Sequence, residues 1–337
     1  MDFGCADHPG GAVVVIRLGW VRLLLGGLRL RDRVPDCVCS RPAAVYAGRE
    51  EAQTSGPARG GAVKDLVRRR PVVAFFALAY LGSWLGWSPW WLSESGIGVL
   101  PFTMPFAVIA LVNQVGLFAG PFAAALIVTR VLDGPGSPRA FLARAFSYRG
   151  RPATYALALI MVPLVVALPY LFLKGKAGVE GLTVSTLVTT LVTYLVYLVG
   201  GPLQEEPGWR GFALPRMQQS MHPLLAAVGL GTVHTFWHAP LFLTDEWDTS
   251  RSDAGQLVAY LLLVVVLSIV LSWVFNISGG SSIPAILAHN SLNWGLLSAG
   301  NLLGSPIVNT WPAALALTVL VAVILAFTRG RLGYSTP

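Results

Sequence analysis

Long apolar runs, separated by charged or turn-forming residues, follow one another from residue 71 to near the end of the chain. Each is close to the twenty or so apolar residues that a helix needs to cross the hydrocarbon layer of a membrane. The runs lie at residues 71–92, 101–129, 154–173, 182–201, 223–243, 256–275, 283–298 and 311–327. We therefore expect an all-α membrane protein with about eight transmembrane helices.

The composition agrees with a membrane protein. Of the 337 residues, 54% are hydrophobic and only 12% are charged, whereas an ordinary soluble domain carries about 25% charged residues. The net charge of +8 would suit a nucleic-acid-binding protein, but half of the 24 Lys and Arg precede residue 71. Most of the others flank the apolar runs, which is the pattern of membrane topology. We therefore expect a lipid bilayer, and no nucleic acid, as a partner.

The basic residues also predict an orientation. They cluster before the first run, in the loops after the second and fourth runs, and after the eighth, while residues 245–253 form an acidic loop on the opposite side. Lys174 and Lys176 are the discordant basic pair. Because basic loops stay in the cytoplasm, we expect a multi-pass protein of the cell membrane with both termini cytoplasmic.

The first 62 residues differ from the rest, being rich in Gly, Arg and Pro and holding all three cysteines. Their apolar patch at residues 13–30 is interrupted by Arg17, Arg22 and Arg29, and three arginines at a bilayer centre are costly. We therefore expect residues 1–62 to be a disordered or loosely structured leader, or an over-long start-site assignment. Residues 63–331 are then the transmembrane domain and residues 332–337 a short tail. No disulfide framework is indicated.

The most informative polar residues directly follow the fourth run, in the segment 204–212. On a helix, Glu206 and Arg210 are one turn apart and share a face, which favours a structural ion pair. Glu205 points about 100° away and has no such partner in its own helix. It is the candidate general base. Pro207 and Gly208 are expected to kink or loosen the helix at this point.

Two later apolar runs each carry a polar pair at the same one-turn spacing. His234 and His238 lie in the fifth run, and His289 and Asn293 lie in the seventh. Asn290 falls on another face and is interpreted as a helix-packing residue. Ionisable residues inside a membrane are costly and usually functional, so we expect the three pairs to meet in one interior site.

These segments resemble the signature of the CAAX-protease and bacteriocin-processing family (CPBP, also ABI), which includes the type II CAAX prenyl endopeptidases. Its three motifs are E-E-x-x-x-R, F-x-x-x-H and H-x-x-x-N. They are matched in order by Glu205, Glu206 and Arg210, by His238, and by His289 and Asn293. The resemblance covers about residues 70–330. One position departs from it, because His234 stands where the second motif has an aromatic residue.

The resemblance implies an intramembrane endopeptidase with its active site in a cavity open to one membrane face. Glu205, helped by His238, would remove a proton from a water molecule that attacks the scissile carbonyl. His289 and Asn293 would stabilise the oxyanion. Glu206 and Arg210 would support the helix, and Glu206 is a second candidate for the base.

The family has been described both as zinc proteases and as metal-independent glutamate proteases. We favour the metal-free account, because an asparagine and a lone general-base glutamate suit it better. A zinc site would instead use Glu205, His238 and His289, with His234 as a further ligand. His234 is therefore either a harmless substitution beside the site or an extra metal ligand.

Two other classes of function compete with the peptidase. The first is a non-catalytic bacteriocin self-immunity or secretion-assisting membrane scaffold, which the intact set of motif residues disfavours. The second is a proton-coupled transporter, which the lack of an internal repeat disfavours. The expected partner is a peptide or membrane-protein substrate: in eukaryotic relatives a prenylated C-terminal peptide, in a bacterial chain a leader-type peptide, a bacteriocin precursor or a membrane-protein tail.

Overall fold

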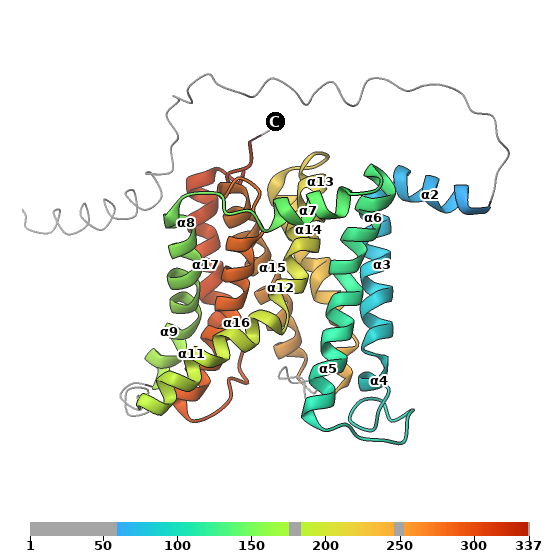
Figure 1. The fold of residues 1–337 in the computed structure, drawn as a ribbon. Coiled ribbons are helices and arrows are strands. Elements are labelled where there is room, and N and C mark those ends of the chain that lie inside the picture. The colour runs from blue at the N-terminus through green and yellow to red at the C-terminus, as the bar shows by residue number, and fades with distance from the viewer. Residues whose placement is uncertain (1–58, 175–182, 246–252, 336–337) are drawn as a thin grey trace, which may run out of the picture. The chain divides into compact units, whose positions relative to one another are not determined.

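The computed structural model describes residues 59–174, 183–245 and 253–335, and every regular element in these ranges is helical (Figure 1). In chain order, the elements are α2 (Arg59–Arg69), α3 (Pro71–Gly86), α4 (Ser88–Trp91), α5 (Phe106–Leu117), η1 (Phe118–Phe122), α6 (Ala123–Asp133), α7 (Ser137–Ala145), α8 (Pro152–Ala156), η2 (Leu157–Met161), α9 (Val162–Lys174), α11 (Val184–Val199), α12 (Pro202–Gly208), η3 (Trp209–Ala213), α13 (Leu214–Gln218), α14 (Pro223–Trp237), η4 (Leu241–Leu243), α15 (Ala254–Ile277), α16 (Ile283–Leu303) and α17 (Trp311–Thr328).

Within the described residues, five helical segments are long and apolar enough to cross a membrane. They are Phe106–Asp133, Pro152–Lys174, Val184–Gln218, Ala254–Ile277 and Trp311–Thr328. The apolar helix α3 is shorter, with 16 residues, and α14 has 15. The predicted all-α membrane protein is therefore confirmed for the described part of the chain, whereas the number of eight transmembrane helices stays a prediction.

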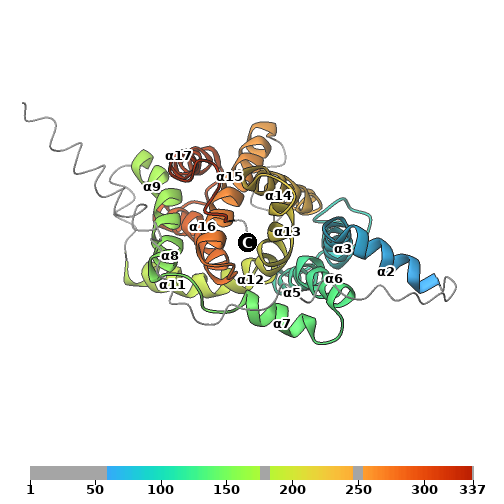
Figure 2. The same cartoon turned by 90° about the horizontal axis from the view of Figure 1, so that it is seen from above.

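The helices that carry the second and third motifs, α14 and α16, are covered by their neighbours. Helix α14 packs along α15, and α16 packs against α9, α11 and α15, an arrangement that can be followed from above in Figure 2. Most residues of α16 from Pro284 to Leu292 are buried, so this part of the helix is covered on nearly all sides. The buried polar side chains of α14 and α16, among them His234 and His289, are thereby surrounded by protein.

The predicted fourth run and the first motif form one long helical segment with a break in it. Helix α11 ends before Gly200, and Pro202 begins α12, where its missing N–H belongs to the group of donors that a helix start leaves unpaired. Pro207 lies inside α12, and the π-helical turn η3 follows directly at Trp209. The helix is thus widened where the sequence predicted a kink, because a π-turn accommodates the missing proline donor.

Close backbone contact locks α12 in place. A Cβ atom on Gly208 would lie 2.5 Å from the carbonyl oxygen of Pro121, so only glycine allows α12 to touch η1 here. Pro121 itself interrupts the predicted second run, which forms α5 and α6 joined through η1. Behind this contact, Trp209 packs edge-to-face on Phe75 of α3, with ring centroids 5.4 Å apart. The motif helix is therefore fixed from two sides.

In two of the predicted runs, the helix ends before the apolar sequence does. The run 71–92 forms α3 and the short α4, with a break at Trp87. The run 223–243 is α14 only as far as Trp237, since His238 caps the helix and Pro240 precedes the short η4, which begins at Leu241. Apolar composition does not mark these ends, because the chain stays buried beyond them.

The predicted leader lies almost wholly outside the described residues. Its last four residues, 59–62, belong to α2, so the described helical unit begins slightly before the predicted boundary. Of the predicted C-terminal tail, residues 332–335 are described and Leu332 is buried. Leu332 also accepts a hydrogen bond at its carbonyl from the side chain of Asn276 at 3.0 Å, which ties the tail to α15.

Candidate active site

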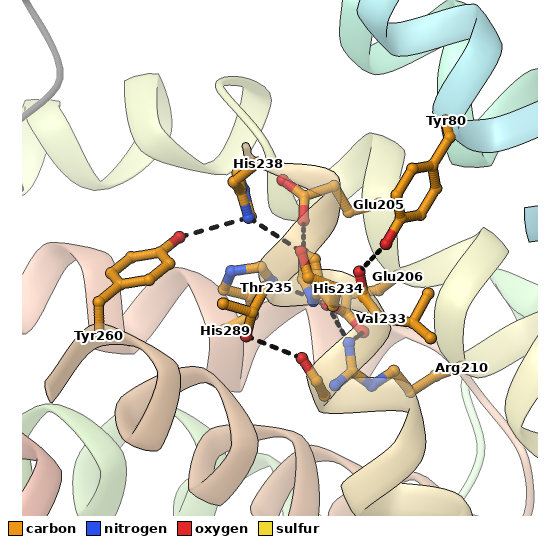
Figure 3. Close-up of polar contacts among 11 residues, drawn as sticks. Tyr80, Glu205, Glu206, Arg210, Val233, His234, Thr235, His238, Tyr260 and His289 are labelled. Atoms are coloured by element: carbon orange, nitrogen blue, oxygen red, sulfur yellow. Dashed lines mark hydrogen bonds and ion pairs between the residues drawn. The ribbon is translucent and has the colours of Figure 1, made fainter. Parts of the chain in front are cut away.

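Side chains from α12, α14 and α16 converge at one buried place in the bundle, with Arg210 added from η3 (Figure 3). The carboxylates come from α12 and the histidines from the other two helices. All are buried, at relative exposures of 9% or less: Glu205, Glu206, Arg210, His234, His238 and His289. The predicted meeting of the three motifs is thus observed for every one of their charged or histidine members.

Glu206 lies at the centre of a charged trio. Arg210 Nη1 lies 3.0 Å from both oxygens of Glu206, which is the ion pair expected from the one-turn spacing. His289 Nδ1 donates to Glu206 Oε1 at 2.7 Å. Because a carboxylate only accepts, Nδ1 of His289 carries its proton. Oε1 of Glu206 accepts from both partners, whereas Oε2 lies at ion-pair distance from Arg210 and receives no hydrogen bond from the described residues. Because this fully buried carboxylate is paired with the Arg210 charge, it is a poor candidate for removing a proton from water.

Glu205 has different surroundings from its neighbour in the sequence. Its Oε2 lies 2.7 Å from Nε2 of His234 on α14. Its Oε1 lies on the side of Gly201, where a Cβ atom would come within 2.8 Å of that oxygen. The absence of a side chain at Gly201 thus keeps space next to Oε1. The two adjacent glutamates have different surroundings: Glu206 is paired with Arg210 and His289, and Oε2 of Glu205 contacts His234.

His238 is oriented by its own helix end. Its Nδ1 lies 3.1 Å from the carbonyl oxygen of His234 and 3.3 Å from the hydroxyl of Tyr260. A carbonyl only accepts, so Nδ1 carries a hydrogen and the lone pair of a neutral His238 is on Nε2. The ring stacks on His234, with centroids 5.0 Å apart. Nε2 is therefore the nitrogen of a neutral His238 that carries the lone pair a base or a metal ligand needs.

The structure differs in part from the contacts that the sequence predicted between the glutamates and the histidines. The sequence paired Glu205 with His238 and left His234 beside the site, whereas the structure gives Glu205 a direct contact to His234. His289 contacts Glu206 rather than standing apart as an oxyanion donor. His234, which the sequence left as either a harmless substitution or an extra metal ligand, is thus in direct contact with the candidate base.

The two asparagines of α16 lie differently. Asn293, one turn after His289, is half-buried. Asn290 is fully buried and its amide donates to the carbonyl of Tyr194 on α11 at 2.9 Å. The helix-packing interpretation of Asn290 therefore fits its contact, and the role of Asn293 stays a prediction.

Sequence reasoning missed Tyr260, whose hydroxyl reaches His238 from α15. The available signal was weak: Tyr260 is a lone polar aromatic in an otherwise aliphatic stretch of that helix. It also missed the indole of Trp209, which lies with its ring centroid 5.1 Å from that of His234. Aromatic residues are frequent in membrane helices, so neither position is distinctive without the fold.

The donor types fit a zinc site. Two groups of side chains have ligand atoms within 4.8 Å of one another: Glu205, His234 and His238, and Glu205, Glu206 and His289. Neither is the predicted set, because His234 takes the place of His289 beside Glu205 and His238. Two ligands on one tetrahedral zinc ion would be about 3.3 Å apart. The 2.7 Å between Glu205 and His234 is instead a hydrogen-bond distance.

The same part of the chain is recognised in comparison with known families. Residues 186–295 match the family model described as type II CAAX prenyl endopeptidase, Rce1-like. The match supports the resemblance of the three motifs to the CAAX-protease family. The CAAX-family segment runs from α11 to α16, about a third of the chain, and contains all three motifs. No match was found among curated proteins.

Proposed function

We propose that this protein is an intramembrane endopeptidase that hydrolyses a peptide bond with a water molecule activated by Glu205 and His238. The observation that carries the proposal is the pair of adjacent buried carboxylates with unlike partners. Glu206 is engaged by Arg210 and His289, whereas Glu205 has one oxygen on the open side of Gly201. The family match to an endopeptidase family supports the same reaction class.

In the proposed reaction, Glu205 takes a proton from water as the water oxygen bonds to the scissile carbonyl carbon. His238 assists through Nε2, the nitrogen that its backbone contact leaves with a lone pair. When the C–N bond breaks, Glu205 returns the proton to the leaving amine nitrogen, as a general acid. Peptide hydrolysis is then complete, with one water consumed.

The tetrahedral intermediate places a negative charge on the former carbonyl oxygen, and we assign its stabilisation to His289 and Asn293. Glu206 accepts the Nδ1 proton of His289, so His289 offers Nε2 as a donor when it carries protons on both nitrogens. When His289 is doubly protonated, the net charge of the trio Glu206, Arg210 and His289 is +1. Donors of this kind are each worth about 10²–10³ in rate.

We propose that the reaction needs no metal ion, because the Glu205–His234 separation is that of a hydrogen bond and Glu205 is then free to act as the base. If zinc were bound, Glu205, His234 and His238 would hold it, and it would polarise the water or the carbonyl. Glu205 could then no longer serve as the base in the same way.

The protein is a multi-pass membrane protein, and we propose that both termini are cytoplasmic in the cell membrane. Exposed arginines lie in the segments that the orientation predicts to be cytoplasmic, among them Arg130, Arg139 and Arg144. The proposed substrate is a peptide or membrane-protein segment that reaches the site from the bilayer. Reporter fusions at each terminus, active only in the cytoplasm or only outside it, measure this topology. Reporters on opposite sides would contradict it.

The reaction is tested with membranes of cells that express the full chain and with an internally quenched peptide library as the probe. Glu205→Gln, His238→Ala and His289→Ala should each lower cleavage at least about 100-fold. Phe236→Ala is the matched control, since this residue of α14 is 57% exposed. Retention of full cleavage by all three site variants would refute the peptidase. Intact folding of each variant is checked by its tryptophan fluorescence and its elution in detergent.

A further inference from the structure

His234 is the one position at which this chain departs from the second family motif, and it contacts the candidate base directly. We propose that His234 is a positioning residue: it holds Oε2 of Glu205, so that Oε1 is the oxygen that receives the proton from water. The proposal rests on the proposed function of Glu205. It assigns to His234 a role that the phenylalanine of the F-x-x-x-H motif cannot perform, because phenylalanine has no hydrogen-bond donor.

The contact itself requires a donor on the histidine. Nε2 of His234 and Oε2 of Glu205 are 2.7 Å apart, and their side chains are only 3% and 6% exposed. An ionised carboxylate accepts hydrogen bonds and donates none, so Nε2 carries the hydrogen whenever Glu205 is ready to act as a base. A hydrogen bond to an ionised group in such a dry place is strong and well oriented.

Two aromatic rings pack against the imidazole ring of His234, so it can impose an orientation on Glu205. It stacks on His238 with an interplanar angle of 24° and a centroid distance of 5.0 Å. It also lies against Trp209, with centroids 5.1 Å apart and an angle of 34°. An aromatic ring fits this slot for the same reason, but phenylalanine has no N–H. A substitution at position 234 can therefore keep the packing of a flat ring and remove the hydrogen-bond donor.

Fixing Oε2 directs the other oxygen toward Gly201. A Cβ atom at Gly201 would lie 2.8 Å from Oε1, so this oxygen has a side-chain-free neighbour just where α12 begins. In the proposed reaction the proton of water moves to Oε1, and the Nε2 hydrogen of His234 stays on its nitrogen throughout. His234 then gains and loses no proton, and it acts only through Glu205.

The first test measures kcat and KM on quenched peptides that the wild-type protein cleaves. His234→Phe keeps a flat ring and removes the donor, and we expect kcat to fall about 10–100-fold with KM little changed, as for other groups that orient a reacting ligand. His234→Gln places an amide N–H near the position of Nε2 and should recover a large part of kcat. Phe236→Ala, on the exposed side of the same helix, is the control.

The second test needs no substrate. The chain has five histidines, and ¹⁵N-histidine NMR of the full protein in detergent reports the Nε2 hydrogen of His234, assigned by its loss in His234→Phe. We expect a hydrogen-bonded imidazole signal that moves when Glu205→Gln replaces the carboxylate. A signal unaffected by Glu205→Gln would overturn the contact.

The two tests separate the failure of this proposal from failure of the proposed function. Wild-type kcat in His234→Phe, alongside loss of cleavage in Glu205→Gln, would refute the positioning role while leaving the peptidase standing. Equal loss of kcat in His234→Phe and His234→Gln would also count against it, because donation would then not matter. Unchanged cleavage in Glu205→Gln would instead refute Glu205 as the base of the proposed function, and the NMR result would still decide whether His234 holds Glu205.

Discussion

Replacing Arg210 by methionine is the sharpest stability test of the buried trio. Arg210 and Glu206 are both 0% exposed, and Nη1 of Arg210 serves both carboxylate oxygens at 3.0 Å. Removing one partner of a buried ion pair typically costs about 3–5 kcal/mol, since a buried charge is left uncompensated. His289 would still donate to Glu206 at 2.7 Å, so we expect the lower end, about 3 kcal/mol. For 337 residues, with an unfolding entropy of about 2.1 cal/mol/K per residue, that is a fall in Tm of about 4 °C.

The assay is thermal unfolding in detergent, followed by the fluorescence of the tryptophans, with Arg139→Met on the exposed face of α7 as the control. The double variant Glu206→Gln/Arg210→Met replaces both charges and should recover at least about 1 kcal/mol relative to Arg210→Met. Two results would contradict the reasoning. One is a Tm for Arg210→Met equal to that of the control. The other is a double variant no more stable than Arg210→Met alone.

Three further predictions follow from the contacts. Gly201→Ala should lower kcat at least about tenfold without unfolding the protein, because its Cβ would lie 2.8 Å from Oε1 of Glu205; the control Gly200→Ala should stay near wild type, and equal rates for the two would contradict this. Tyr260→Phe should lower kcat less than about tenfold, since it removes only the longer, 3.3 Å contact of His238; a loss as large as that of His238→Ala would contradict it. Exhaustive chelation should leave cleavage unchanged, and a loss of activity together with stoichiometric zinc would overturn the metal-free proposal.

Much of the fold could be read from the sequence. Apolar runs predicted helices close to their observed bounds, as for 256–275, found as Ala254–Ile277, and 311–327, found as Trp311–Thr328. The Glu206–Arg210 ion pair was also predictable, because both residues are on one helical segment and a spacing of four residues fixes their separation. Contacts within a helix follow from its repeat and need no tertiary structure.

Helix ends and breaks were less accessible. The end of α14 at Trp237 and the break before α12 at Gly201 lie inside apolar or buried sequence. Hydropathy does not change at such points, since the chain stays inside the protein after the helix has ended. For the π-turn after Pro207, the sequence predicted only that the helix would be kinked or loosened, without the type of turn.

The sequence by itself determined that carboxylates, an arginine and histidines would stand one helical turn apart on three apolar segments, and that together they indicated a CAAX-type site. It did not determine which histidine meets which glutamate. That choice depends on how far α14 and α16 are shifted and rotated relative to α12, which is set by contacts such as the one between Gly208 and Pro121. A residue's neighbours on its own helix follow from spacing, whereas the pairing of Glu205 with His234 and of Glu206 with His289 was decided by packing between helices.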